Sequence, residues 1–173
     1  MDNVDVTAAS SRGVLVINAP TGNVVSAVEH TFALLFALLR RVADASVSLA
    51  SGKWEKSKFI GTELAGKTLG IVGLGQVGSR VAARASAFEA RLLGHDPYLP
   101  LEKAREMGVP LVSLEELLAA SDIVTLHATA TSDARRTSER NSSIASWARS
   151  RRRSSSGVIE LSPNGSSSRG KRT

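Results

Sequence analysis

Cysteine is absent from the 173 residues of this chain. Its absence excludes a disulfide framework, a thiolate metal site and a cysteine nucleophile. Long hydrophobic runs are also missing: the longest apolar block, residues 31–39, is too short to span a bilayer and is bounded by His30 and Arg40. The first five residues are acidic and lack the basic and apolar regions of a secretory signal. We therefore expect a cytoplasmic protein by default, and organelle targeting stays open if the natural N-terminus lies upstream.

Histidine is scarce as well, with only His30, His95 and His127 in the chain. Each lies at or near the end of a predicted element, where an isolated histidine is usually a hydrogen-bonded part of the scaffold. No spacing of His, Asp and Glu resembles a metal site. We therefore expect no metal site, and we prefer a scaffold role to a catalytic one for each histidine.

Positive charge is unevenly distributed along the chain. The formal net charge is +6, but ten of the 22 Lys and Arg residues and only two of the 16 acidic residues lie in residues 135–173. This segment therefore carries a net charge of +8, and residues 1–134 carry −2. The segment has twelve serines and nine arginines and no sustained apolar period, which predicts a disordered, basic tail.

Three interpretations of this Arg/Ser-rich tail stay open. It could be an arm whose arginines bind RNA or other phosphates. It could be a disordered terminus without a specific role. It could also be an out-of-frame translation, which we favour, because the composition changes abruptly where another βαβ unit is needed to complete a sheet.

The most informative segment is a glycine-spaced turn between an apolar run and an amphipathic stretch. Residues 69–72 are typical of a buried strand, and apolar residues recur at helical spacing after the turn. Gly73 allows a tight turn, Gly75 lets a pyrophosphate approach the backbone, and Gly78 lets the helix pack close to the strand. The helix N-terminus would then face the phosphates with free N–H groups.

An acidic residue supports the same interpretation. A second predicted strand, residues 92–95, ends at Asp96, which lies 18 residues after Gly78. From this place a carboxylate reaches the ribose hydroxyls of adenosine and would repel a 2′-phosphate, so the pattern favours NAD over NADP. The alternative is a structural glycine turn with a surface aspartate, and the agreement of context and acid argues against it.

The rest of the pattern alternates strands and helices. The other predicted elements are a strand at 14–17, a helix at about 26–42, a loop through Trp54 and Phe59, a polar helix at 102–107, a short helix after Ser113 and a strand at 123–126. Ser113 and Glu116 fit a capping box. This alternation predicts an α/β fold with a doubly wound parallel sheet. The apolar segment 31–39 should be buried, for which a dimer interface is one solution.

Five segments together resemble a known family. They are NAPTGN at 18–23, SAVEHT at 26–31, GTELAGKTLGIVGLGQVG at 61–78, HDPY at 95–98 and SDIVTLH at 121–127. With them the chain resembles the NAD-dependent D-2-hydroxyacid dehydrogenases, in particular those that oxidise 3-phosphoglycerate, over about residues 2–134. The resemblance implies an incomplete Rossmann-type NAD-binding domain at 21–134, a remnant of a flavodoxin-like substrate domain at 1–20, and a tail at 135–173 outside the family pattern.

The resemblance also implies a cofactor site and partners. The implied cofactor-binding residues are in the glycine turn, at the end of the second strand and in the loop after the third: Gly73, Gly75, Gln76, Val77, Gly78, Asp96 and Ala128. In the loop after the third strand, members of the family usually have the sequence H-x-P, whereas this chain has His127, Ala128 and Thr129. The implied partners are a second copy, bound through the nucleotide domain, and a small 2-hydroxy acid.

The resemblance does not assign catalytic residues to this chain. The family holds the substrate carboxylate with an Arg and takes the hydroxyl proton with a His oriented by a Glu. Those positions lie downstream of residues 121–127, so we assign no catalytic residue and expect the chain by itself to be inactive. Three functions stay open: a dehydrogenase fragment that acts at the head of serine synthesis, a non-catalytic NAD-binding or dimerising module, and a nucleic-acid binder. The last is least favoured, because Glu55 interrupts the basic loop around Trp54.

Overall fold

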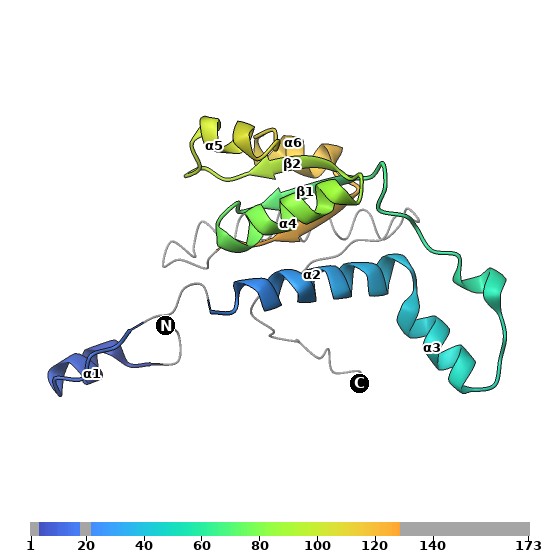
Figure 1. Ribbon diagram of the computed structural model, residues 1–173, viewed down its shortest axis with the longest axis horizontal. Coiled ribbons are helices and arrows are strands. Elements are labelled where there is room, and N and C mark those ends of the chain that lie inside the picture. The colour runs from blue at the N-terminus through green and yellow to red at the C-terminus, as the bar shows by residue number, and fades with distance from the viewer. Residues whose placement is uncertain (1–3, 18–21, 129–173) are drawn as a thin grey trace, which may run out of the picture.

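The centre of the molecule is a three-stranded parallel sheet in the order β2–β1–β3. The computed structural model describes residues 4–17 and 22–128. Its strands are β1 Thr68–Val72, β2 Arg91–His95 and β3 Ile123–Leu126 (Figure 1). Ile71 of the central strand pairs with Gly94 on one side and with Thr125 on the other. These three predicted strands are confirmed, each to within one residue at its ends.

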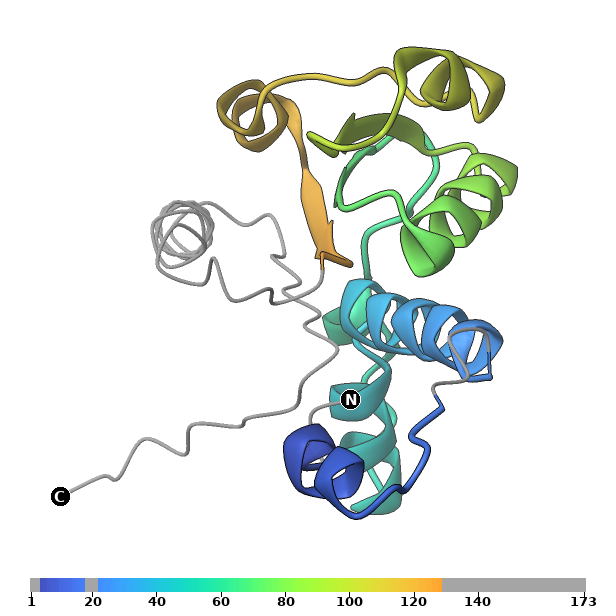
Figure 2. The ribbon, with the colours of Figure 1, turned by 90° about the vertical axis from the view of Figure 1, so that its left-hand side faces the viewer.

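Helices cover both faces of the sheet. The four that pack around it are α2 Val24–Leu39, α4 Gln76–Ala87, α5 Leu101–Glu106 and α6 Leu114–Ala120. Leu69 and Ile71 of β1 pack into one core cluster with α2 and α4, whereas Val72 packs with α6 in a second cluster. Figures 1 and 2 show α4 and α6 on opposite sides of the strands. A strand that is apolar on both sides requires two covering layers, and the predicted doubly wound arrangement is confirmed.

The α4 helix lies close to the sheet because its inward face is small. Val81, Ala82 and Ala85 are buried, and they follow the spacing of one helical stripe. The α6 helix begins with the predicted capping box: Glu116 N–H donates to Ser113 Oγ, and Ser113 N–H donates to the Glu116 carboxylate. Such reciprocal bonds satisfy two backbone donors at a helix start. The box fixes the start of α6, the helix that leads the chain into β3.

The α2 helix is amphipathic rather than buried all round. Val28, Phe32, Leu35 and Leu39 pack into the core cluster with α4, and each such side chain contributes about 1.5–3 kcal/mol of burial energy. On the other side of the helix, apolar side chains stay exposed, among them Leu38 at 48%. The predicted burial of residues 31–39 is therefore met on one face, and burial of the other face at a dimer interface stays a prediction. No helix within the described ranges has the length and apolar character to cross a bilayer.

The predicted helix at 26–42 is wrong at its C-terminal end. The α2 helix ends at Leu39, and α3 Val42–Ala50 begins after a break at which Arg41 has a φ of 53°. This left-handed conformation costs a non-glycine residue on the order of 1 kcal/mol. It is compensated at Arg41, whose guanidinium donates to the Asp44 carboxylate at 3.0 Å and to the Lys58 carbonyl oxygen at 2.7 Å.

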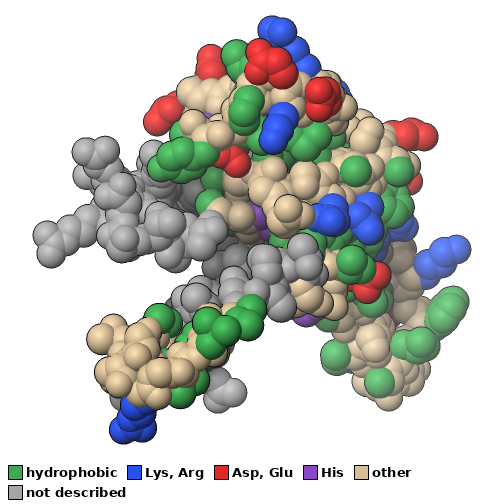
Figure 3. All heavy atoms as spheres, turned by 60° about the vertical axis from the view of Figure 1, so that its left-hand side comes forward, with side chains coloured by type: hydrophobic (Ala, Val, Ile, Leu, Met, Phe, Trp, Pro, Cys, Tyr) green, Lys and Arg blue, Asp and Glu red, His purple; other side chains and the backbone are tan. Residues whose placement is uncertain are grey.

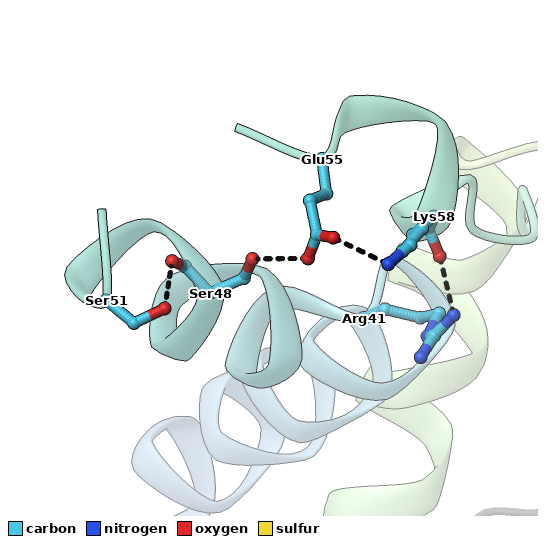
Figure 4. Close-up of polar contacts among 5 residues, drawn as sticks. All are labelled: Arg41, Ser48, Ser51, Glu55 and Lys58. Atoms are coloured by element: carbon cyan, nitrogen blue, oxygen red, sulfur yellow. Dashed lines mark hydrogen bonds and ion pairs between the residues drawn. The ribbon is translucent and has the colours of Figure 1, made fainter. Parts of the chain in front are cut away.

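Polar contacts tie α3 to the segment that follows it. A 3-10 turn, η1 Lys56–Phe59, lies within the predicted loop. Glu55 accepts hydrogen bonds from Ser48 of α3 and from Lys58, so one carboxylate joins the two elements (Figure 4). We call residues 42–60 the arm, because Figure 1 shows it extending away from the sheet. Trp54, at 80% exposure, lies on its surface.

The predicted strand at 14–17 is also wrong. These residues have no regular secondary structure, and they follow a short helix, α1 Val6–Ser11, whose start is capped by the Asp5 side chain. A strand needs a neighbour to bond its alternate N–H and C=O groups. No strand of the described residues lies beside this segment, and Leu15 is 81% exposed. An apolar β-branched run is therefore insufficient to make a strand here.

Candidate nucleotide-binding site

The strand order reverses between β1 and β3, and we call the region at the carboxyl ends of these two strands the crevice. The chain leaves β1 for β2 on one side, and then crosses to β3 on the other. Ligands of doubly wound sheets bind where such a reversal occurs. At this point Gly73 has a φ of +88°, and a Cβ on it would lie 2.7 Å from the Ala128 backbone nitrogen. A side chain at Gly73 would therefore separate the two strand ends that form the crevice.

The glycine turn connects β1 to α4 as the spacing predicts. A Cβ on Gly78 would collide with the Gly73 carbonyl oxygen, so only glycine allows α4 to pack this closely. Gly75, in contrast, faces open space, with no heavy atom within 4 Å of a Cβ built there. The predicted close approach of strand and helix is present at Gly78, and the space beside Gly75 would accommodate a phosphate.

The start of α4 has the properties of an anion site. No side chain caps it, and no acidic residue lies in its first turn. The N–H groups of Gln76, Val77 and Gly78 precede the first intrahelical bond, in which Ser79 N–H donates to the Gly75 carbonyl oxygen. Free N–H groups and the helix dipole together favour a bound anion. These residues therefore fit the pyrophosphate of a dinucleotide.

Asp96 lies beside the same turn. One of its carboxylate oxygens accepts a hydrogen bond from Leu74 N–H at 2.8 Å, and the other accepts one from Tyr98 N–H at 3.0 Å. Gly73 N–H donates to the carbonyl oxygen of His95 in β2, so backbone and side-chain bonds both join the turn to this strand. Each carboxylate oxygen keeps capacity for a ribose hydroxyl. The spacing argument predicted the acid, but the bond to Leu74 carried no sequence signal.

His127 lies at the far side of the crevice. The backbone N–H of His127 donates to the Val72 carbonyl oxygen at 2.8 Å. The ring Nε2 of His127 lies 2.9 Å from Thr125 Oγ1. Burial lowers the pKa of His127 from 6.5 to about 4, so the ring is neutral at pH 7. His95 makes a similar ring contact, with Nδ1 3.0 Å from the Val112 carbonyl oxygen. Both histidines are hydrogen-bonded within the scaffold, and His30 is exposed.

A further side chain at the site was missed by the sequence analysis. Arg80 Nη1 donates to both the carbonyl oxygen and the Oε1 of Gln76, each at 2.8 Å. The only sequence signal for this contact is the i, i+4 spacing of the two residues on a helix. No group of three or more His, Asp and Glu residues in the described ranges is arranged to hold a metal ion.

Comparison with known proteins identifies the family to which this site belongs. Residues 32–142 match the model of the D-isomer specific 2-hydroxyacid dehydrogenase family, NAD-binding domain. The chain belongs to this family. The match confirms the predicted Rossmann-type fold and NAD as the cofactor, and it ends eight residues beyond residue 134, at which the sequence analysis placed the end of the domain.

Curated relatives from an archaeon, a bacterium and a plant are named D-3-phosphoglycerate dehydrogenase. The chain is 48% identical to D-3-phosphoglycerate dehydrogenase of Archaeoglobus fulgidus, 50% to that of Mycobacterium leprae and 49% to the chloroplastic D-3-phosphoglycerate dehydrogenase 2 of Arabidopsis thaliana. Each alignment covers 127 residues, or 73% of this chain. It covers only 24%, 24% and 20% of these relatives, so the chain spans about a quarter of their length.

Solved structures agree on the fold. The apo structure of D-lactate dehydrogenase from Escherichia coli superimposes with a TM-score of 0.70 at 31% identity, over 77% of this chain and 42% of that one. D-Lactate dehydrogenase from Aquifex aeolicus, in complex with NAD and lactic acid, gives 0.66 at 33% identity, over 77% and 40%. These neighbours confirm the fold, whereas the roles of the individual cofactor-binding residues stay predictions.

Proposed function

We propose that the whole protein oxidises a D-2-hydroxy acid with NAD, that the acid is 3-phosphoglycerate, and that the product is 3-phosphohydroxypyruvate, the first step of serine synthesis. The observation that carries this proposal is the identity of 48–50% with D-3-phosphoglycerate dehydrogenases over 127 residues. The crevice supports it, because its glycine turn and its acid suit the pyrophosphate and the ribose of NAD. The cytoplasm stays the expected compartment, although two relatives are named as chloroplastic.

The residues of this chain would bind and orient the cofactor. The bound nicotinamide would supply the hydride acceptor. The N–H groups of Gln76 and Val77 would bind the pyrophosphate beside Gly75, and Asp96 would accept hydrogen bonds from the ribose hydroxyls and repel a 2′-phosphate. Ala128, whose backbone lies against Gly73, would line the crevice on the β3 side.

The test uses the full chain with NADH, and then with NAD and 3-phosphoglycerate. We expect saturable NADH binding without turnover, because no described residue matches the Arg, Glu or His that the family uses for chemistry. Supplying the missing regions, as a full-length dehydrogenase in which residues 4–128 of this chain replace the corresponding segment, should restore turnover. Absence of NADH binding to the chain, or an inactive chimera that still binds NADH, would contradict the proposal.

A non-catalytic dimerising module is the second candidate, and exposed apolar side chains favour it. Leu34 and Leu38 of α2 are 40% and 48% exposed, and on α3 Val47 and Leu49 are exposed too. Figure 3 shows hydrophobic side chains at the surface of the two parts of the molecule that project downward in this view. A self-complementary apolar face is typical of a two-fold homodimer. Through this face the chain would pair with itself or with subunits of the full enzyme.

The oligomeric state tests this second candidate. We expect the full chain to be a dimer by sedimentation, and Leu38→Glu to shift it toward monomer, since an unpaired carboxylate would be buried in the interface. Leu101→Glu is the matched control, because Leu101 is 57% exposed and belongs to α5, a helix that lies away from α2 in Figure 1. A monomeric wild-type chain, or equal effects of both variants, would contradict the assignment.

A further inference from the structure

The start of α4 holds a cation at a place where helices favour acidic residues. Arg80 lies one turn into the helix, and its guanidinium folds back onto Gln76, the first residue of α4. The helix dipole places partial positive charge at an N-terminus, so a second positive charge there is unfavourable unless an anion lies nearby. A bound anion beside the first turn of α4 would therefore stabilise Arg80 in this position.

No described residue forms an ion pair with Arg80. The two ion pairs of the described residues join Arg41 to Asp44 and Lys58 to Glu55, which lie within the arm or directly before it and far from α4 in sequence. The first turn of α4 has neither an acidic residue nor a side-chain cap. The first turn of α6, in contrast, has both, in Glu115, Glu116 and the Ser113 cap. Asp96 beside the glycine turn accepts bonds from Leu74 and Tyr98 and forms no ion pair with Arg80, so the guanidinium is free to pair with a bound anion.

We propose that Arg80 binds the pyrophosphate of the dinucleotide and that the side chain of Gln76 positions it. This inference rests on the proposed cofactor site, in which that pyrophosphate lies beside Gly75. Nη1 of Arg80 is held by the two oxygens of Gln76, while its Nε and Nη2 donors have no partner among the described residues. A guanidinium offers two parallel donors to phosphate oxygens, and such charge-assisted bonds are about twice as strong as neutral ones.

Gln76 thereby acquires two separate roles. Its backbone N–H lies in the free first turn of α4, where it faces the same anion directly. Its side chain restricts Arg80 to one orientation, which lowers the entropy lost when the guanidinium binds a phosphate. A dinucleotide would then be held by neutral backbone donors and by one formal charge, and that charge makes its affinity sensitive to salt.

Arg84 provides a matched control on the same helix. It repeats the arrangement one turn later, because its Nη1 donates to the Arg80 carbonyl oxygen at 3.2 Å. One turn moves it about 5.4 Å farther from the helix start. Substitution of either arginine by glutamine removes one charge from α4, but only Arg80→Gln removes it from beside the free N–H groups.

The experiment measures the dissociation constants of NADH, ADP and adenosine by calorimetry, with the full chain and its variants. We expect Arg80→Gln to weaken NADH and ADP roughly fivefold to tenfold and to leave adenosine, which has no phosphate, unchanged. Arg84→Gln should stay within about twofold of wild type for all three ligands, and Arg80→Lys should recover part of the loss. Raising the salt should reduce the difference between wild type and Arg80→Gln.

The outcomes separate this inference from the proposed function. If wild type binds NADH and Arg80→Gln binds it equally well, the role of Arg80 is wrong and the cofactor site stands. If Arg80→Gln weakens adenosine as much as ADP, the side chain acts on the structure rather than on the phosphates, and the inference is overturned. If wild type binds neither NADH nor ADP, both proposals fail. Equal melting temperatures would show that the variants are folded.

Discussion

Asp96 connects two parts of the site through its two carboxylate oxygens. One oxygen holds the glycine turn by the bond from Leu74 N–H, and the other holds the loop after β2 by the bond from Tyr98 N–H. These two bonds hold the carboxylate in one orientation toward an incoming ribose. Preorganisation of this kind reduces the entropy that binding would otherwise lose.

Substitution of Asp96 should therefore change both affinity and cofactor preference. Hydrogen bonds to a charged group contribute about 1.5–3 kcal/mol, so Asp96→Ala should weaken NADH binding roughly tenfold or more. NADPH should be affected less, because the variant also removes the charge that repels its 2′-phosphate. Fluorescence titrations with both cofactors measure this. An unchanged ratio of the two affinities would show that Asp96 does not contact the ribose.

His127 should make stability depend on pH in the acidic range. Its pKa is about 4 in the folded protein and 6.5 in the unfolded chain, because burial disfavours the charged ring. Above pH 6.5 both states are neutral; as the pH falls toward 4, the unfolded chain takes up a proton and the folded protein does not. Stability is therefore lost from pH 6.5 down to about 4, by at most about 3 kcal/mol.

The variant His127→Gln isolates this effect. Its amide can still bond Thr125 Oγ1 but does not titrate. Denaturant unfolding at a series of pH values should give a smaller loss between pH 6.5 and 4 for the variant than for wild type. Identical pH profiles would mean that the ring of His127 is open to solvent.

At the scale of elements, the segments that agree with their tertiary surroundings could be predicted from sequence. The run at 69–72 is apolar and β-branched, and the fold places it at the centre of the sheet, so local and global preferences coincide. The run at 14–17 has the same local character, but without a neighbouring strand it stays irregular. Sequence patterns report side-chain preferences, whereas strand pairing depends on the rest of the chain.

The break between α2 and α3 illustrates the second limit of sequence reasoning. Neither glycine nor proline marks it, and the turn instead depends on Arg41, whose guanidinium bonds Asp44 and the Lys58 carbonyl oxygen. The bond to residue 58 spans 17 positions, so no local signal exists for it. The same is true of the Leu74 to Asp96 bond at the site, which spans 22 positions.

The capping box of α6 offers a direct test at this scale. Ser113→Ala removes the side-chain acceptor for Glu116 N–H and one half of the reciprocal pair. We expect a loss of about 1 kcal/mol in the free energy of unfolding, with NADH affinity unchanged, because the box lies on the opposite face from α4. Urea denaturation measures this loss. An unchanged midpoint would indicate that α6 starts equally well without the cap.

At the scale of the whole molecule, the fold packs the sheet and its helices tightly and leaves apolar side chains exposed elsewhere. The sheet forms one apolar cluster with α2 and α4 on one face and a second with α6 on the other. The arm and the residues around α1 expose apolar side chains instead, for example Leu15 and Trp54. The predicted Arg/Ser-rich tail lies outside the described residues, so its three interpretations stay open. The cofactor site therefore depends on the part of the chain that is best packed.

The most direct test of the account is NADH binding by the full chain compared with Gly75→Val. The added side chain would meet no heavy atom of the described protein within 4 Å of its Cβ, and Gly75 has a φ of −69° that any residue can adopt, so the fold should be kept. The same side chain would fill the space beside the first turn of α4. We predict that wild type binds NADH and that folded Gly75→Val does not; equal binding by both would place the cofactor elsewhere and contradict the central claim.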